Sequence, residues 1–176
     1  MAGLSIGLVL LLAWSAAGGE FRVALMDHPP RLDGKIEPRE WQRSVALSGF
    51  AFQGRMDRRK ATGYVAATQT HIYLAIASQL PDEGELLARV HKNSVKVVYD
   101  DSIEVWLDPT PGSEHGQTFQ ILVNPLGYRG YKHHARGRVR ENPTWEGNWQ
   151  VANGFHDGRW HCEIAIPIEQ VAPGRK

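Results

Sequence analysis

The chain has 176 residues, of which 42% are hydrophobic and 22% are charged, and its formal net charge is +1. This is the profile of one ordinary globular domain with a sizeable core, and it excludes a disordered chain. The near-neutral charge also excludes a global attraction to polyanions or polycations, so any charge argument about partners must be local.

The chain begins with an almost unbroken apolar run over residues 4–14, which leads into the small residues 15–19. This order predicts a secretory signal peptide over residues 1–19, although no Lys or Arg precedes the run. A buried strand or helix is the alternative, and a transmembrane helix needs a longer run of about 20 apolar residues. We therefore expect a secreted protein, periplasmic or extracellular, with no membrane attachment after signal cleavage and one domain over residues 20–176.

The rest of the sequence predicts short strands separated by turn residues, which is typical of an all-β protein. Strands are expected where apolar and polar residues alternate, at residues 71–77, 102–108, 119–124, 149–152 and 160–166. A helical turn is expected at residues 37–41, which have Pro at their second position, and a short amphipathic helix at residues 86–90. Because alternation leaves each sheet with one apolar and one polar face, we expect a two-sheet antiparallel β-sandwich.

The last two expected strands flank Asp157-Gly158, a pair typical of tight β-hairpins. In the second of these strands Cys162 lies on the apolar face, and His161 and Glu163 lie on the opposite face. We expect His161 to lie on a solvated surface and Glu163 to belong to a polar sheet face. Cys162 is the sole cysteine, so no internal disulfide forms and an inert, buried thiol is expected.

The strand at residues 102–108 has a tryptophan on its polar face, because its aliphatic residues alternate with Glu104 and Trp106. Saccharides have apolar C–H faces and a rim of hydroxyls, so an aromatic ring beside a carboxylate suits them. Gln120 and Asn124 share one face of the next strand, and their amides both donate and accept hydrogen bonds. The alternatives are that Trp106 packs beneath a loop, that Glu104 pairs with an arginine, and that Asn124 opens an Asn-Pro turn.

The order of motifs along the chain resembles that of the family 9 carbohydrate-binding modules and related sugar-binding sandwiches. The motifs are RLDGKIEPREW, HIYLAIA, DDSIEVWLDP, FQILVNPLG, and NWQVA with GRWHCEIAIPI, and the match runs from about Leu32 to Pro167. The resemblance implies a secreted sandwich of jelly-roll type that binds sugar between aromatic rings on a concave sheet. It also implies a role in polysaccharide degradation, so the expected partners are a carbohydrate and a glycoside hydrolase in the same or a neighbouring polypeptide.

Carried over by position, the resemblance assigns sugar binding to Glu104 and Asn124, whereas Leu122 stands at the position of the family's arginine. One tryptophan wall of the family's sugar slot falls at Val98, with Tyr99 one residue further on. The second wall belongs to a strand beyond this sequence, so we expect the domain to be C-terminally incomplete. Together with the polar-face residues, the predicted sugar-binding set is Trp106, Glu104, Asn124, Gln120, Tyr99 and Glu163.

Two further groups of charged residues have their own interpretations. Asp100, Asp101 and Asp108 are candidate ligands of a structural calcium ion, although no EF-hand spacing is present. Residues 128–140 contain five Lys or Arg and no acid, which favours either a variable hairpin loop or contact with an anionic polysaccharide. A nucleic acid is not an expected partner.

No motif for a catalytic nucleophile elbow, a zinc helix, a Walker loop or a dinucleotide site occurs in the sequence. Non-catalytic carbohydrate binding is therefore the predicted function. The alternatives are an accessory or catalytic domain of a glycoside hydrolase, and a haem-b-binding sandwich of related fold that uses Met56 with His71 or His91.

Overall fold

The computed structural model describes residues 22–52, 55–56, 59–111, 116–135, 138–140 and 148–172. The described residues form two compact units, one containing residues 86–140 and the other containing residues 22–85 and 148–172. We call them the four-strand unit and the five-strand unit after their main sheets. The predicted signal peptide, residues 1–19, lies outside the described residues.

Among the residues that the structure describes, no helix has the length and apolar character needed to cross a membrane.

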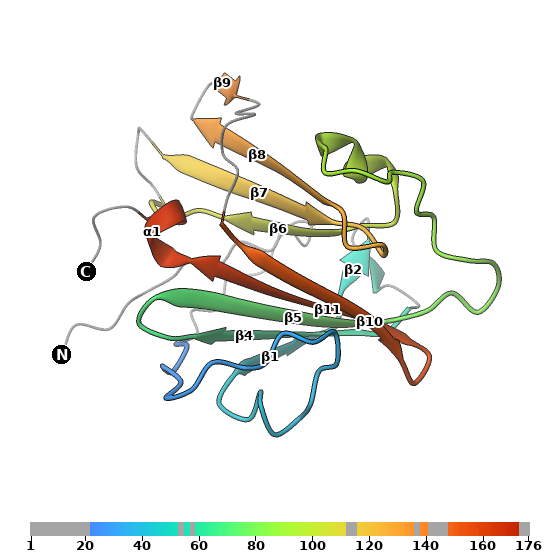
Figure 1. Cartoon of the computed structure of the whole chain (residues 1–176), viewed down its shortest axis with the longest axis horizontal. Coiled ribbons are helices and arrows are strands. Elements are labelled where there is room, and N and C mark those ends of the chain that lie inside the picture. Colours follow the sequence, from blue (N-terminus) through green and yellow to red (C-terminus); the bar gives the residue numbers. More distant parts are fainter. Residues whose placement is uncertain are drawn as a thin grey trace. The chain divides into compact units, whose positions relative to one another are not determined.

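The sheet of the five-strand unit is antiparallel throughout and has the order β1-β4-β5-β11-β10 (Figure 1). Its strands are β1 (Val45–Ser48), β4 (Ala61–Ala67), β5 (His71–Gln79), β10 (Gln150–His156) and β11 (Arg159–Pro167). The same unit contains the antiparallel pair β2 (Ala51–Phe52) and β3 (Arg55–Met56) and the helical turn α1 (Ile168–Val171). Asp157 and Gly158, which join β10 to β11, have φ angles of 51° and 69°. Positive φ at both positions is the geometry of a tight hairpin turn, so the predicted hairpin is confirmed.

Both faces of β11 are buried, which the alternation of its sequence does not indicate. One face carries Cys162, which is fully buried as predicted, and burial raises the pKa of its thiol so that it stays protonated. The other face is covered by the chain before β1, where Trp41 packs in one cluster with Tyr73 of β5 and Ala165 of β11. The expectation of a solvated His161 is therefore wrong, because this segment lies over it and leaves it 8% exposed.

The sheet of the four-strand unit is also antiparallel and has the order β6-β7-β8-β9. Its elements are the 3₁₀ helix η1 (Val95–Tyr99) and the strands β6 (Ile103–Leu107), β7 (Gln117–Val123), β8 (Arg129–Ala135) and β9 (Arg138–Arg140). Val105 and Leu107 are buried on the face that alternation predicts to be apolar. The predicted fold class, all-β with two antiparallel sheets and almost no helix, is confirmed.

Residues 86–90 do not form the predicted helix. Asp100 accepts hydrogen bonds from the backbone N–H groups of Arg89 and Val90, at 2.9 and 3.0 Å. Asp101 accepts one from the N–H of Leu87 at 2.7 Å. Because carboxylates from a later part of the chain occupy these donors, the segment is held in an irregular conformation rather than a helix. The expected turn at residues 37–41 is present, with a bond of 3.0 Å from Glu40 N to Glu37 O.

Candidate functional site

Glu104 lies at the centre of a hydrogen-bonded cluster on one face of the four-strand sheet. Its Oε2 atom accepts hydrogen bonds from Trp106 Nε1 at 3.2 Å and from Gln120 Nε2 at 3.1 Å. The register explains this contact, since Trp106 on β6 pairs with Gln120 on β7 and paired residues point to the same face. Three of the predicted site residues are therefore brought together. Trp106 and Glu104 are half-buried, which leaves part of each side chain accessible.

His134 on β8 completes this group, which we call the Glu104 cluster. Its Nε2 atom lies 3.1 Å from Gln120 Oε1. Because the Gln120 amide nitrogen donates to Glu104, its oxygen is the acceptor here, so His134 Nε2 carries the proton and Nδ1 is left as an acceptor. The imidazole stacks on the indole of Trp106, with ring centroids 4.9 Å apart and planes inclined by 28°. Burial, aided by neighbouring basic residues of β8, lowers the pKa of His134 and favours its neutral form.

Sequence reasoning did not select His134, because residues 128–140 look like a loop rich in charge. One signal in the sequence could have indicated His134. Lys132 and His134 lie two residues apart, so they share one face of a strand, which is β8 in the structure.

Asn124 lies outside the Glu104 cluster and anchors the loops next to β7. It is fully buried, and its Nδ2 donates to Asp100 Oδ2 and to Val90 O, both at 2.9 Å. Its Oδ1 accepts a hydrogen bond of 2.9 Å from Tyr128 N, and Gly127 N donates to its backbone carbonyl at 2.9 Å, as in the Asn-Pro turn. Burial by itself raises the pKa of Asp100, but the bonds from Asn124 and from two backbone N–H groups outweigh it and hold the pKa below its usual value.

The other predicted residues of this unit are not among the hydrogen-bonded members of the cluster. Tyr99 ends η1 and is 77% exposed. Asp108 Oδ1 accepts a hydrogen bond of 2.8 Å from Thr110 N. Within the described ranges, no three His, Cys, Asp or Glu side chains are grouped closely enough to hold a metal ion. The arrangement therefore gives no support to calcium binding at Asp100, Asp101 and Asp108, and this stays a prediction.

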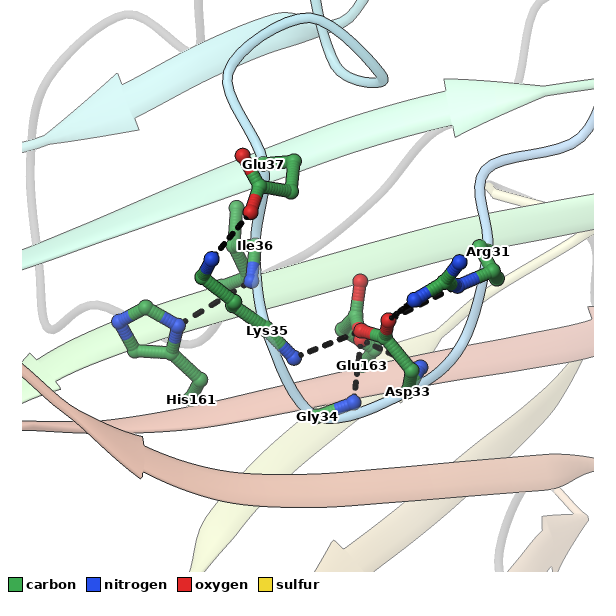
Figure 2. Close-up of polar contacts among 8 residues, drawn as sticks. All are labelled: Arg31, Asp33, Gly34, Lys35, Ile36, Glu37, His161 and Glu163. Atoms are coloured by element: carbon green, nitrogen blue, oxygen red, sulfur yellow. Dashed lines mark hydrogen bonds and ion pairs between the residues drawn. The ribbon is translucent and has the colours of Figure 1, made fainter.

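Glu163 belongs to the five-strand unit, where it holds the turn at Asp33 and Gly34 (Figure 2). Its Oε2 atom accepts hydrogen bonds from Gly34 N at 2.8 Å and from Asp33 N at 3.1 Å. Burial raises the pKa of this carboxyl to about 7, although the two N–H groups oppose the rise. Its Oε1 atom is buried and has no hydrogen-bond partner among the described residues. Glu163 therefore anchors the turn at Asp33 and Gly34 to β11.

The residues 31–37, which we call the docked loop, have further contacts that Figure 2 shows. His161 Nδ1 accepts a hydrogen bond of 3.1 Å from Ile36 N, so this histidine is a second anchor on β11. Gly34 has a φ of 83°, and a Cβ atom there would lie 2.6 Å from the carbonyl carbon of Asn153. Glycine is therefore required at this position both for its backbone conformation and for the close approach to β10.

Several solved structures share the fold of this chain, although no family model matches the sequence and the search of curated proteins found no relative. A candidate carbohydrate-binding protein from Bacteroides uniformis is 11% identical, with a TM-score of 0.63 over 86% of this chain and 73% of that one. A family 9 carbohydrate-binding module from Caldicellulosiruptor kristjanssonii, in complex with glucose, is 11% identical, with a TM-score of 0.55 over 81% of this chain and 66% of that one.

A family 9 module from the same organism, in complex with cellotriose, is 12% identical. It has a TM-score of 0.52 over 80% of this chain and 64% of that one. The predicted resemblance is thus confirmed for the fold, which this chain shares with these three structures.

Proposed function

We propose that this protein binds carbohydrate without catalysis, through the Glu104 cluster. The observation that carries the proposal is the sharing of one carboxylate oxygen, Glu104 Oε2, by the indole N–H of Trp106 and the amide of Gln120. These bonds fix an aromatic ring beside a carboxylate on a sheet face. The fold that the chain shares with modules bound to glucose and cellotriose supports the same function.

The polar atoms of the cluster suit sugar hydroxyls. Glu104 Oε1 has no hydrogen-bond partner among the described residues, so it is available to accept from a hydroxyl. His134 Nδ1 is a second acceptor, because Nε2 carries the proton. Because His134 already stacks on one face of the Trp106 indole, we assign the opposite face to the apolar side of the sugar.

The expected affinity is modest. Covering one indole face of roughly 100 Å² contributes about 2.5 kcal/mol at ordinary hydrophobic coefficients. A few hydrogen bonds add about 1 kcal/mol each, and the cost of association reduces this sum, so we expect roughly millimolar binding. Such binding is useful in a module that acts beside an enzyme, so the proposal includes export and a partnership with a polysaccharide-degrading hydrolase.

The cluster supports binding more than hydrolysis. Glycosidases use two carboxyl groups about 5 to 10 Å apart, on either side of the bond that breaks. The Glu104 cluster contains one carboxylate, and both hydrogen bonds to its Oε2 atom come from neutral side chains that fix its position. A fixed carboxylate that accepts hydrogen bonds is a recognition group.

Calorimetric titration of glucose and of cellotriose into the wild type and Trp106→Ala tests the proposal. We expect the variant to lose affinity by roughly tenfold or more, since it lacks the stacking surface. Phe155→Ala is the matched control, because Phe155 is also an accessible aromatic residue, 53% exposed, on β10 of the other unit. Equal affinity of Trp106→Ala and the wild type, with circular dichroism showing both folded, would overturn the proposal.

A further inference from the structure

We propose that the saccharide recognised at the Glu104 cluster carries an anionic substituent, a carboxylate or a sulfate, which pairs with Lys132. This inference rests on the proposed function and specifies the class of sugar. It also gives a role to part of the basic stretch at residues 128–140, which the Glu104 cluster alone leaves unexplained.

The register places Lys132 in the same row of the sheet as the aromatic ring. Trp106 on β6 pairs with Gln120 on β7, and Gln120 in turn pairs with Lys132 on β8. Paired residues of an antiparallel ladder point to the same face, so the ring, the amide and the ammonium follow one another across three strands. The charge of Lys132 is close enough to His134 to contribute to the lowered pKa of that histidine.

The described residues supply no anion to Lys132. The ion pairs found among them include Arg31 with Asp33, Lys35 with Glu37, and Arg43 with Asp27, and none of these contains Lys132. Lys132 is half-buried, and a partly desolvated ammonium is stabilised by an anion that reaches it. The neighbouring His134 is held neutral, so Lys132 is the cation of this row.

The two charged groups of the face lie at opposite ends of the proposed site. Two strand spacings and one two-residue step separate Glu104 from Lys132, which places their Cβ atoms about 12 Å apart. Both side chains are long, so a sugar ring on Trp106 spans the remaining gap between them. Hydroxyls at one end then meet a carboxylate acceptor, and an acidic group at the other end meets an ammonium. A neutral sugar leaves Lys132 unused.

The test compares sugars that differ only in the acidic group, using glucose with glucuronate and galactose with galacturonate. We expect the wild type to bind the acidic member of at least one pair roughly tenfold more tightly at about 50 mM NaCl, and the preference to shrink at about 500 mM NaCl. Lys132→Gln should lose this preference while it keeps the affinity for the neutral sugar. Lys96→Gln is the matched control, because Lys96 is an exposed lysine of η1 in the same unit.

The outcomes separate this inference from the proposed function. A neutral sugar bound in a Trp106-dependent manner, with the acidic sugar no tighter, overturns the charge assignment and leaves carbohydrate binding intact. The charge assignment is also overturned, with carbohydrate binding intact, if Lys132→Gln still binds the acidic sugar more tightly than the neutral one. Absence of binding for all four sugars overturns both. If Lys132→Gln does not fold, Lys132→Arg, which retains the charge, must keep the preference, and the salt dependence of the wild type must still appear. Sulfated glucose as a fifth probe distinguishes a sulfate ligand from a carboxylate.

Discussion

Replacing Glu163 by Gln should change the way in which stability depends on pH. In the folded chain burial raises the pKa of Glu163 to about 7, whereas an exposed glutamate of the unfolded chain titrates near 4.5. Between these values the folded state keeps a proton that the unfolded state has released. The free energy of unfolding therefore falls as the pH rises through this window. At about 1.4 kcal/mol per pH unit, the window allows a loss of at most roughly 3 kcal/mol.

The structure explains why Gln is the informative substitution. Its amide oxygen can accept the same bonds from Gly34 N and Asp33 N that Glu163 Oε2 accepts now. Its NH₂ group replaces Oε1, which has no partner among the described residues, so no existing bond is broken. Because Gln does not titrate, the variant lacks the loss of stability that ionisation of Glu163 causes in the wild type.

Urea unfolding of both proteins at about pH 5 and about pH 8 measures this difference. We expect Glu163→Gln to be close to the wild type at the lower pH and more stable by about 1 to 3 kcal/mol at the higher pH. Glu85→Gln, which removes an exposed carboxylate of the same unit, is the matched control. The reasoning is refuted if the difference between Glu163→Gln and the wild type is the same at both pH values.

Three further predictions concern a glycine that closely approaches backbone, a buried amide and a histidine that titrates. In thermal melts Gly34→Ala should lower the Tm of the protein more than Gly84→Ala does. Both glycines have positive φ, but only at position 34 would a Cβ atom meet backbone atoms, so equal shifts of Tm would contradict this prediction. Asn124→Ala should lower the free energy of unfolding in urea by about 2 to 4 kcal/mol, since three hydrogen bonds are lost; a loss below about 1 kcal/mol contradicts it. Affinity for a neutral sugar should fall as the pH is lowered through the depressed pKa of His134, because protonation removes the Nδ1 acceptor. Calorimetric titrations at several pH values test this, with His134→Gln as the control that cannot be protonated there. If the affinity of the wild type depends on pH no more than that of His134→Gln, the prediction is contradicted.

Local sequence patterns correctly predicted the features that depend only on residues close together in the chain. The alternation around Trp106 placed this ring opposite the buried Val105 and Leu107, and the structure has it half-buried on that face. Asp157 and Gly158 predicted their hairpin because two successive residues with positive φ define the turn. Such features are fixed within a few residues, so one sequence is enough to read them.

Features that depend on distant contacts were not predictable in this way. His161 has the spacing of a surface residue, and its burial follows from Ile36, which is 125 positions away. The apolar spacing of residues 86–90 suits a helix, but Asp100 and Asp101 bind the N–H groups of that segment instead. His134 joins the Glu104 cluster only because β7 and β8 pair in a register that the sequence does not state.

Glu104 and Glu163 show why the surroundings of a carboxylate decide its role. Each lies on a strand beside aliphatic neighbours, and each was a candidate sugar ligand on the same ground of alternation. Glu163 is fully buried and its bonded oxygen holds backbone N–H groups of the docked loop, so a ligand would have to displace part of the fold to reach it. Glu104 is half-buried, and its bonded oxygen holds two side chains that are themselves suited to a sugar. A carboxylate that orients an indole and an amide while its second oxygen stays available is preorganised for a ligand, and for this reason the proposed function is assigned to Glu104.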